Sequence, residues 1–323
     1  MSTRTLLIGI DEAGYGPLLG PLVISAVAFE TPSEIADLSL WTTLGASVSP
    51  SLDAGRGRIP ILDSKKLHRP KDGLLRLERS ALPVLTAWRG LPSHLRGLLS
   101  LVAPDVINLL RDYAWYADHD LALPHEADSG AVRIAAKLLQ ADLAANSIEI
   151  GGLWSEVLLE GHYNRLVRTT QNKSVVLLGL TLRLMQRIAD AFPDRELRFF
   201  IDKQGAREHY GPMLLRSFDD RRLKILEERP DYSAYELTGA ETHWQIHFTQ
   251  SGESCHLPTA LASIISKYLR ELFMACFNDY WRRKDEFLKP TAGYYADGLR
   301  FIRDIEPHLA TLGVQRHTLV REK

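Results

Sequence analysis

The stretch GIDEAGYGPLLG, Gly9 to Gly20, places two adjacent carboxylates at the end of an apolar run and directly before a glycine-rich turn. The preceding residues, Thr5 to Ile10 (TLLIGI), are apolar and β-compatible, and Pro21 to Phe29 (PLVISAVAF) form a second run rich in Val, Ile and Phe. Glycine and proline between the runs predict a short turn, so the two strands are expected to be antiparallel neighbours. Asp11 and Glu12 then mark the point at which the first strand leaves the core.

The composition is that of an ordinary globular protein. The 323 residues are 45% hydrophobic and 24% charged, and the formal net charge is -1. The chain has no apolar run near the eighteen or so residues that span a bilayer, and residues 1–7 do not resemble a secretory leader, so we expect a cytoplasmic protein with no membrane partner. Cys255 and Cys276 are too few for a disulfide framework. With so little net charge, a nucleic acid would have to be held by a local basic surface.

Later segments predict an alternation of helices and strands. Residues 45–60 are rich in Gly, Ser and Pro and predict a mobile loop, and residues from about 92 to 172 carry helical patterns that predict a mainly helical insertion. Ser174 to Phe192 is apolar over most of a helix surface and should be buried against a sheet. Leu197 to Ile201 (LRFFI) and Thr242 to Thr249 (THWQIHFT) predict strands, and a further helix is expected from Pro258.

Each of these strands runs into an acidic residue. The first ends at Asp11 and Glu12, the second at Asp202, and the third continues to Glu253. Side chains beyond the carboxyl ends of strands in α/β sheets converge in a crevice, so the four acids could share one site. Four clustered carboxylates repel one another, and two divalent ions about 4 Å apart would neutralise them and assist phosphoryl displacement. Taken singly, a strand-end acid is more often a turn former or a solvated cap.

The N-terminal motif resembles the opening of the type 2 ribonucleases H, the ribonuclease HII family, whose pattern is an apolar strand, DEAGRGPLAGP and a second apolar strand. DSKKL at Asp63 to Leu67 is also similar to a motif of that family. FFIDKQG at Phe199 to Gly205 resembles its strand ending in Asp-Gly, and GESCHLPTALASIISK at Gly252 to Lys267 resembles its Gly-Asp-Ser to Ala-Ser-Ile-x-Ala-Lys stretch. KPTA near the C-terminus weakly resembles the Tyr-Pro-Thr segment of the family.

The resemblance implies a fold and an architecture. The fold is α/β, a ribonuclease H-like mixed five-stranded sheet flanked by helices, with a helical insertion and a helical C-terminal part. Residues 1–275 would form the catalytic domain, including the loop 45–60 and the insertion at about 92–172. Residues 276–323 would form a helical extension that contributes to substrate binding.

The resemblance also implies an activity. The chain would be a metal-dependent endonuclease that hydrolyses the RNA strand of RNA/DNA hybrids, or cuts 5′ of a ribonucleotide embedded in duplex DNA, and leaves 5′-phosphate ends. It would act as a monomer, with two Mg²⁺ or Mn²⁺ ions held by the catalytic residues Asp11, Glu12, Asp202 and Glu253. The residues implied to bind substrate are Gly14, Tyr15, Gly16, Ser64, Lys65, Lys66, Ser263, Lys267 and Tyr294.

Several positions depart from the family pattern. Glu253 stands where the family has Asp, which lengthens the arm by about 1.5 Å, and Tyr15 replaces the arginine of Gly-Arg-Gly. Lys203 replaces a glycine, and the tyrosine that stacks on a sugar falls on Lys289, so Tyr294 or its neighbour would have to take that role. Tyr15 is equally compatible with an ordinary turn aromatic and with a platform for a sugar or base.

These departures leave two other functions open. One is a nucleic-acid-binding protein with this fold that has lost or altered its catalytic activity. The other is a nuclease whose substrate, such as longer hybrids or structured DNA, is selected by the insertion. Cleavage of a duplex that carries a single ribonucleotide, compared with an Asp11→Asn variant, separates these readings.

Overall fold

We describe the chain in a computed structural model, over residues 4–53, 55, 57–68, 73–205, 207–239 and 242–322. Within these residues the main sheet has seven strands in the order β5-β2-β1-β6-β9-β8-β7, and a separate pair, β3-β4, is parallel. The strands are β1 Arg4–Ala13, β2 Leu22–Pro32, β3 Val48–Ser49, β4 Ile59–Pro60, β5 Glu149–Leu158, β6 Glu196–Asp202, β7 Arg222–Glu228, β8 Tyr232–Thr238 and β9 His243–Thr249.

The main sheet is mixed. Strands β1 and β2 are antiparallel, as their short connection predicts, whereas β1-β6 and β6-β9 are parallel and the remaining pairs are antiparallel. The predicted α/β class is therefore confirmed, although the sheet has seven described strands where five were expected. The sequence predicted β1, β2, β6 and β9; it did not predict β5, which lies inside the segment 92–172, or the two strands of the β7-β8 hairpin.

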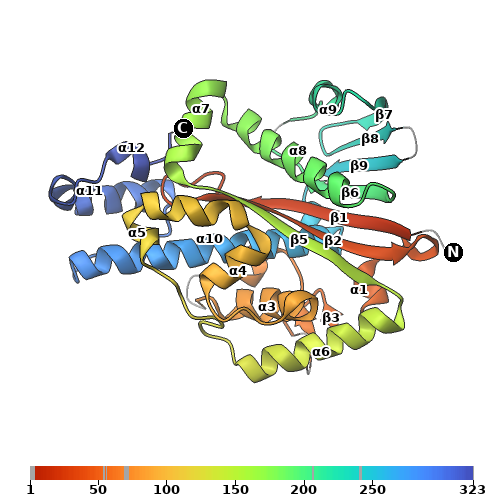
Figure 1. The fold of residues 1–323 in the computed structure, drawn as a ribbon, viewed down its shortest axis with the longest axis horizontal. Coiled ribbons are helices and arrows are strands. Elements are labelled where there is room, and N and C mark those ends of the chain that lie inside the picture. The colour runs from red at the N-terminus through yellow and green to blue at the C-terminus, as the bar shows by residue number, and fades with distance from the viewer. Residues whose placement is uncertain are drawn as a thin grey trace.

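Helices cover both faces of the sheet (Figure 1). The α-helices are α1 Leu40–Thr43, α2 Ser64–Leu67, α3 Leu75–Arg89, α4 Leu95–Val102, α5 Ala114–Ala117, α6 Ser129–Ala145, α7 Glu160–Thr170, α8 Lys173–Ala191, α9 Gly211–Ser217, α10 Leu257–Lys284, α11 Tyr295–Thr311 and α12 Arg316–Leu319. The described residues also form the 3-10 helices η1 Ser33–Ile35, η3 Pro104–Asp112 and η4 Gly252–Ser254. None of the helices in the described ranges is long and apolar enough to cross a membrane.

Alternation along β1 and β2 divides the core into two layers. Leu6, Ile8 and Ile10 pack with the buried face of α8, while Leu7 and the opposite side of β2 pack with α10 and α3. Helix α8 is buried against the sheet as its apolar pattern predicts. The start of α10 lies directly on β1 at Gly9, because a Cβ on Gly9 would come within 2.0 Å of the backbone of Thr259. This contact brings the N-terminal turns of α10 to the end of β1.

Three predicted segments differ in detail. The loop 45–60 contains the β3-β4 pair, with Val48 and Ile59 buried, because its few apolar residues reach the core. The insertion 92–172 is mainly helical but includes the edge strand β5. Helix α10 runs through position 275, where the expected boundary between the catalytic domain and the C-terminal extension falls.

Candidate functional site

The sheet brings the first three acids to one edge. In the parallel β1-β6 pair Ile10 is the partner of Ile201, so Asp11 and Asp202 follow at adjacent strand ends. Asp202 is in turn the partner of Thr249, the last residue of β9, and Glu253 follows in η4. The parallel register is therefore what makes neighbours of residues almost two hundred positions apart.

Short hydrogen bonds fix three of these carboxylates. The backbone N–H of Glu12 donates to Asp11 Oδ1 over 2.7 Å, and that of Gly252 donates to Asp202 Oδ1 over 2.8 Å. The hydroxyl of Ser263, on α10, lies 2.8 Å from Glu253 Oε2. The strand ends and α10 thus position these three carboxylates through hydrogen bonds to one oxygen of each.

The acids interact electrostatically as one group. Burial, followed by repulsion from Glu12 and Asp202, raises the pKa of Asp11 well above its usual value. Burial and the Asp202 charge raise the pKa of Glu12 to about 8, against the opposing effect of Lys65. Burial also raises the pKa of Asp202 to about 6, although the Gly252 N–H favours its charged form. The protein therefore compensates poorly for negative charge in this cluster, so Asp11, Glu12 and Asp202 keep their protons to a higher pH than usual.

Helix α2, the DSKKL motif, lies against this cluster. Asp63 caps the helix by accepting from the N–H of Lys65 over 2.8 Å, and the hydroxyls of Ser64 and Ser263 are 2.9 Å apart. The Lys65 ammonium lies 3.5 Å from Glu253 Oε1, and this charge raises the Lys65 pKa. The Lys65 side chain is 82% exposed, so it remains free to contact an anion in solution.

The donor set fits divalent cations by chemical type and charge. All four acids offer carboxylate oxygens, which Mg²⁺ and Mn²⁺ prefer, and cations would relieve the repulsion among them. In the described part of the chain, no three His, Cys, Asp or Glu side chains already form a closed ligand group. A cation would therefore draw the acids together from neighbouring positions.

The glycine-rich turn begins one residue beyond β1. Gly14 has φ +87°, and a Cβ there would lie 2.5 Å from Pro21 O, so both the conformation and the packing require glycine. Gly16 is exposed, and no atom lies within 4 Å of the position its Cβ would take. The Tyr15 ring is half-buried, packs against the α8 layer, and has Lys173 Nζ 5.0 Å from its centroid. The Tyr15 ring therefore packs as part of the fold, and its role as a platform for a sugar or base stays a prediction.

The remaining predicted residues lie on α2, on α10 and at the start of α11. Lys66 is exposed on α2, and the partly buried Lys267 forms an ion pair with Glu271 over 3.7 Å on α10. Tyr294 is 52% exposed at the start of α11, and its ring centroid is 5.9 Å from the guanidinium of Arg270. Arg270 also lies against Gly14, so Tyr294 stands beside the glycine-rich turn.

Lys203, one of the departures from the family pattern, points away from the acids. Its ammonium donates to Pro230 O over 2.6 Å and to Arg229 O over 3.2 Å, at the turn between β7 and β8. The lysine that replaces a family glycine therefore holds this hairpin and does not add a charge to the cluster.

The sequence did not predict a role for two arginines that lie beside the turn. Arg270 is 2% exposed on α10 and donates to Leu19 O and Ala292 O, each over 3.1 Å. Arg321, also 2% exposed, donates to Gly14 O and Tyr15 O. Neither position carries a motif or a periodic pattern, so only the folded chain associates them with the turn.

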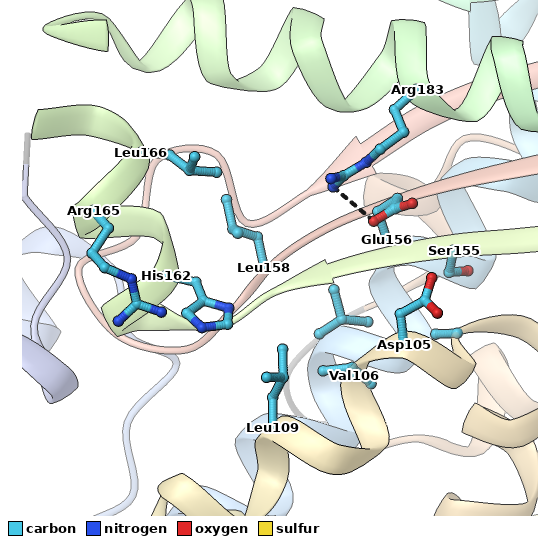
Figure 2. Close-up of a pocket in the computed structure, with 12 residues that line it drawn as sticks. Asp105, Val106, Leu109, Ser155, Glu156, Leu158, His162, Arg165, Leu166 and Arg183 are labelled. Carbon is cyan, nitrogen blue, oxygen red and sulfur yellow. Dashed lines mark hydrogen bonds and ion pairs between the residues drawn. The ribbon is translucent and has the colours of Figure 1, made fainter. Parts of the chain in front are cut away.

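A cavity of about 440 Å³ lies elsewhere, between η3, β5, α7 and α8 (Figure 2). Three of its charged groups form ion pairs: Arg183 binds Glu156 over 2.9 Å, and Asp105 binds the neighbouring Arg187 over 3.3 Å. None of the predicted site residues lines this cavity. The acid cluster and the cavity are thus separate features of the molecule.

Comparison with known proteins gives similarities of structure only. No protein-family model matches the sequence, and no curated protein matches it. Among solved structures, the Bst-RNase HIII complex with Mn²⁺ is 16% identical with a TM-score of 0.46, over 99% of this chain and 67% of that one. The Q54A mutant of Bst-RNase HIII is also 16% identical, with a TM-score of 0.45 over 98% of this chain and 66% of that one.

A third similar structure is that of the PCNA:RNase HII complex from Archaeoglobus fulgidus. It is 15% identical, with a TM-score of 0.43 over 98% of this chain and 94% of that one. The chain spans about two thirds of the length of the two RNase HIII structures. At these identities and TM-scores the similarity assigns no activity to the chain, whose own motifs and acid cluster remain the grounds for a function.

Proposed function

We propose that this protein is a metal-dependent endonuclease that acts, as a monomer, on the RNA strand of RNA/DNA hybrids or 5′ of a ribonucleotide embedded in duplex DNA. The observation that carries the proposal is the gathering of four carboxylates, Asp11, Glu12, Asp202 and Glu253, at and just beyond adjoining strand ends, with Asp11 and Glu253 buried. A structural role does not account for this arrangement, because like charges brought together under burial oppose folding. Such a cluster is expected where its charge serves a cation.

The four acids would hold two Mg²⁺ or Mn²⁺ ions. When bound, such ions supply activation of water for in-line attack on a phosphodiester and charge stabilisation at the leaving 3′-oxygen. Ser263 and the Gly252 N–H orient the Glu253 and Asp202 carboxylates. The product of this hydrolysis carries a 5′-phosphate.

The chain would hold the substrate through Lys65, Lys66 and the glycine-rich turn. Lys65 is exposed beside Glu253 and can contact a backbone phosphate next to the acids. Gly16 leaves open space for a ribose, and the peptide groups of the turn can recognise its 2′-hydroxyl, which distinguishes RNA from DNA. Tyr294, exposed beside the turn, would stack on a neighbouring sugar.

One observation favours a second function, binding without turnover. The described residues contain no closed metal-ligand group, and Glu253 is already engaged by Lys65 and Ser263. In this case the chain would grip a hybrid duplex without cutting it. The two functions share the same surface and differ only in catalysis.

A labelled duplex that carries one ribonucleotide distinguishes the two functions. We expect the wild-type protein to cut this duplex with Mg²⁺ or Mn²⁺ and to leave a 5′-phosphate, whereas Asp11→Asn binds without cutting. Asp219→Asn, which alters an exposed acid outside the cluster, is the matched control and should cut normally. Tight binding by the wild type without a metal-dependent cut would establish the binding protein, and equal cutting of an all-DNA duplex would exclude ribonucleotide recognition.

A further inference from the structure

The last residues of the described chain pass beneath the glycine-rich turn. We call residues 316–322 the C-terminal strap. The backbone N–H of Arg321 donates to Leu18 O over 2.8 Å, and its guanidinium donates through Nη1 to Gly14 O and through Nη2 to Tyr15 O, the latter over 3.2 Å. Arg321 thus holds two consecutive carbonyls of the turn with a single planar group.

Helix α7 fixes the strap in this position. Asn164 donates to His317 O and Val320 O, each over 2.8 Å, and accepts from the N–H of Glu322 over 2.7 Å. The Arg321 guanidinium carbon lies 3.9 Å from the centroid of the Tyr163 ring. Because Asn164 and Tyr163 are 1% exposed, both contacts belong to the packed interior.

Peptide geometry links these contacts to the outer surface of the turn. In a planar trans peptide the C=O and N–H bonds point in opposite directions. The carbonyl of Gly14 shares a peptide plane with the N–H of Tyr15, and the carbonyl of Tyr15 shares one with the N–H of Gly16. Arg321 therefore sets the direction of the two N–H groups that follow by holding their carbonyls from the inner side.

From this geometry we propose that Arg321 is a positioning residue that orients the peptide groups of the Gly14 to Gly16 turn toward a 2′-hydroxyl, and so sets the discrimination between ribose and deoxyribose. The inference rests on the proposed function, because it explains how the same site would recognise the ribose of its substrate. A guanidinium from the end of the chain thereby supports a turn whose own middle residue, Tyr15, carries no cation. Arg321 touches no reacting group.

Three variants test the proposal in the full-length protein. Arg321→Ala removes both carbonyl contacts, and Arg321→Lys keeps one charged donor without the planar fork. Arg316→Ala is the matched control, since Arg316 is an arginine of the same strap whose guanidinium binds Glu306 over 3.3 Å and does not touch the turn. Thermal melting and amide hydrogen exchange over residues 13–16 accompany each assay.

We expect R321A to lower kcat/KM on the single-ribonucleotide duplex by about 10- to 100-fold, because a displaced turn misplaces the ribose. The affinity for an all-DNA duplex, measured in an Asp11→Asn background, should be unchanged, and amide exchange in the turn should accelerate. R321K should restore part of the loss and R316A should match the wild type. If R321A melts at too low a temperature to assay, the same measurements are made on R321K. In that variant the affinity for the single-ribonucleotide duplex should fall relative to the affinity for the all-DNA duplex.

Several results would overturn the inference. If R321A keeps the ribonucleotide preference and the amide exchange rates of the wild type, Arg321 does not orient the turn. If R316A loses as much kcat/KM as R321A, the contacts of the strap contribute only to general stability. Equal weakening of both duplexes would assign Arg321 to non-specific binding. A wild-type protein that cuts no duplex would instead refute the proposed function itself, and the inference with it. Cleavage by the wild-type protein therefore distinguishes the two failures.

Discussion

The hydroxyl of Ser263 lies 2.8 Å from Glu253 Oε2, which ties the carboxylate of η4 to the first turns of α10. The same helix donates from Ser266 to Asp11 O over 2.9 Å at the end of β1. One helix therefore supports two of the four acids, one through its carboxylate and the other through its backbone. Substitutions at Ser263 and Ser266 should therefore affect metal binding and protein stability differently.

Substitution of Ser263 by alanine should weaken metal binding more than folding. The Glu253 carboxylate would lose a hydrogen bond that orients it, and loss of such a partner reduces metal affinity or activity by about 10- to 100-fold. Calorimetric titration with Mn²⁺ measures the affinity. Ser266→Ala is the comparison variant: it should lower the melting temperature while leaving the affinity for Mn²⁺ nearly unchanged, and identical affinities for the two variants would contradict this assignment.

Substitution of Asp202 by asparagine should stabilise the metal-free protein while abolishing cleavage. The raised pKa of Asp202, caused chiefly by burial, means that its charge opposes folding at neutral pH, and its removal should add on the order of 1 to 3 kcal/mol. Asn can still accept the Gly252 N–H. Urea unfolding in EDTA measures the gain, and Asp219→Asn, outside the cluster, should show none. Destabilisation by D202N would indicate that its charge is already compensated.

The two glycines of the turn should respond differently to alanine. Gly14→Ala forces a Cβ to within 2.5 Å of Pro21 O at a positive φ and should cost about 1 to 3 kcal/mol of stability. Gly16→Ala meets no atom within 4 Å and should fold normally. If the turn recognises the ribose, G16A should nevertheless reduce cleavage of a single-ribonucleotide duplex. Normal cleavage by G16A at normal stability would place the ribose elsewhere.

Glu160 should make stability fall as the pH rises. This carboxyl at the start of α7 is fully buried, and desolvation raises its pKa to about 7, although the Tyr116 hydroxyl donates to it over 2.9 Å. The folded state therefore holds a proton that the unfolded state releases above its ordinary pKa of 4.5. Stability is full below that value and is lost progressively up to about pH 7, by about 3 kcal/mol.

The Glu160→Gln variant isolates this effect from Asp11, Glu12 and Asp202, whose raised pKa values change stability in the same direction. The difference in unfolding free energy between the wild type and E160Q, measured in urea from pH 4 to 8, should grow in favour of E160Q as the pH rises. A constant difference over that range would show that Glu160 is charged in the folded state.

The sequence by itself determined the two N-terminal strands, the buried helix before β6, the strand ends occupied by Asp11, Glu12 and Asp202, and the family that these motifs resemble. Local periodicity and turn residues suffice for such elements, because each is encoded within about twenty consecutive residues. The sequence did not predict strand β5, because its two glycines break the alternation. It did not predict β7 either, because most residues of that strand are exposed. Neither strand carries the clear alternation of a half-buried strand.

Only the tertiary structure decided which acids meet and how the turn is held. The parallel register of β1 and β6 sets Asp11 beside Asp202, and burial together with mutual repulsion then raises their pKa values. The contact of Arg321 with Gly14 joins residues 307 positions apart. Local sequence cannot encode such a contact, because its formation depends on the packing of α7, α10 and the C-terminal strap around the turn.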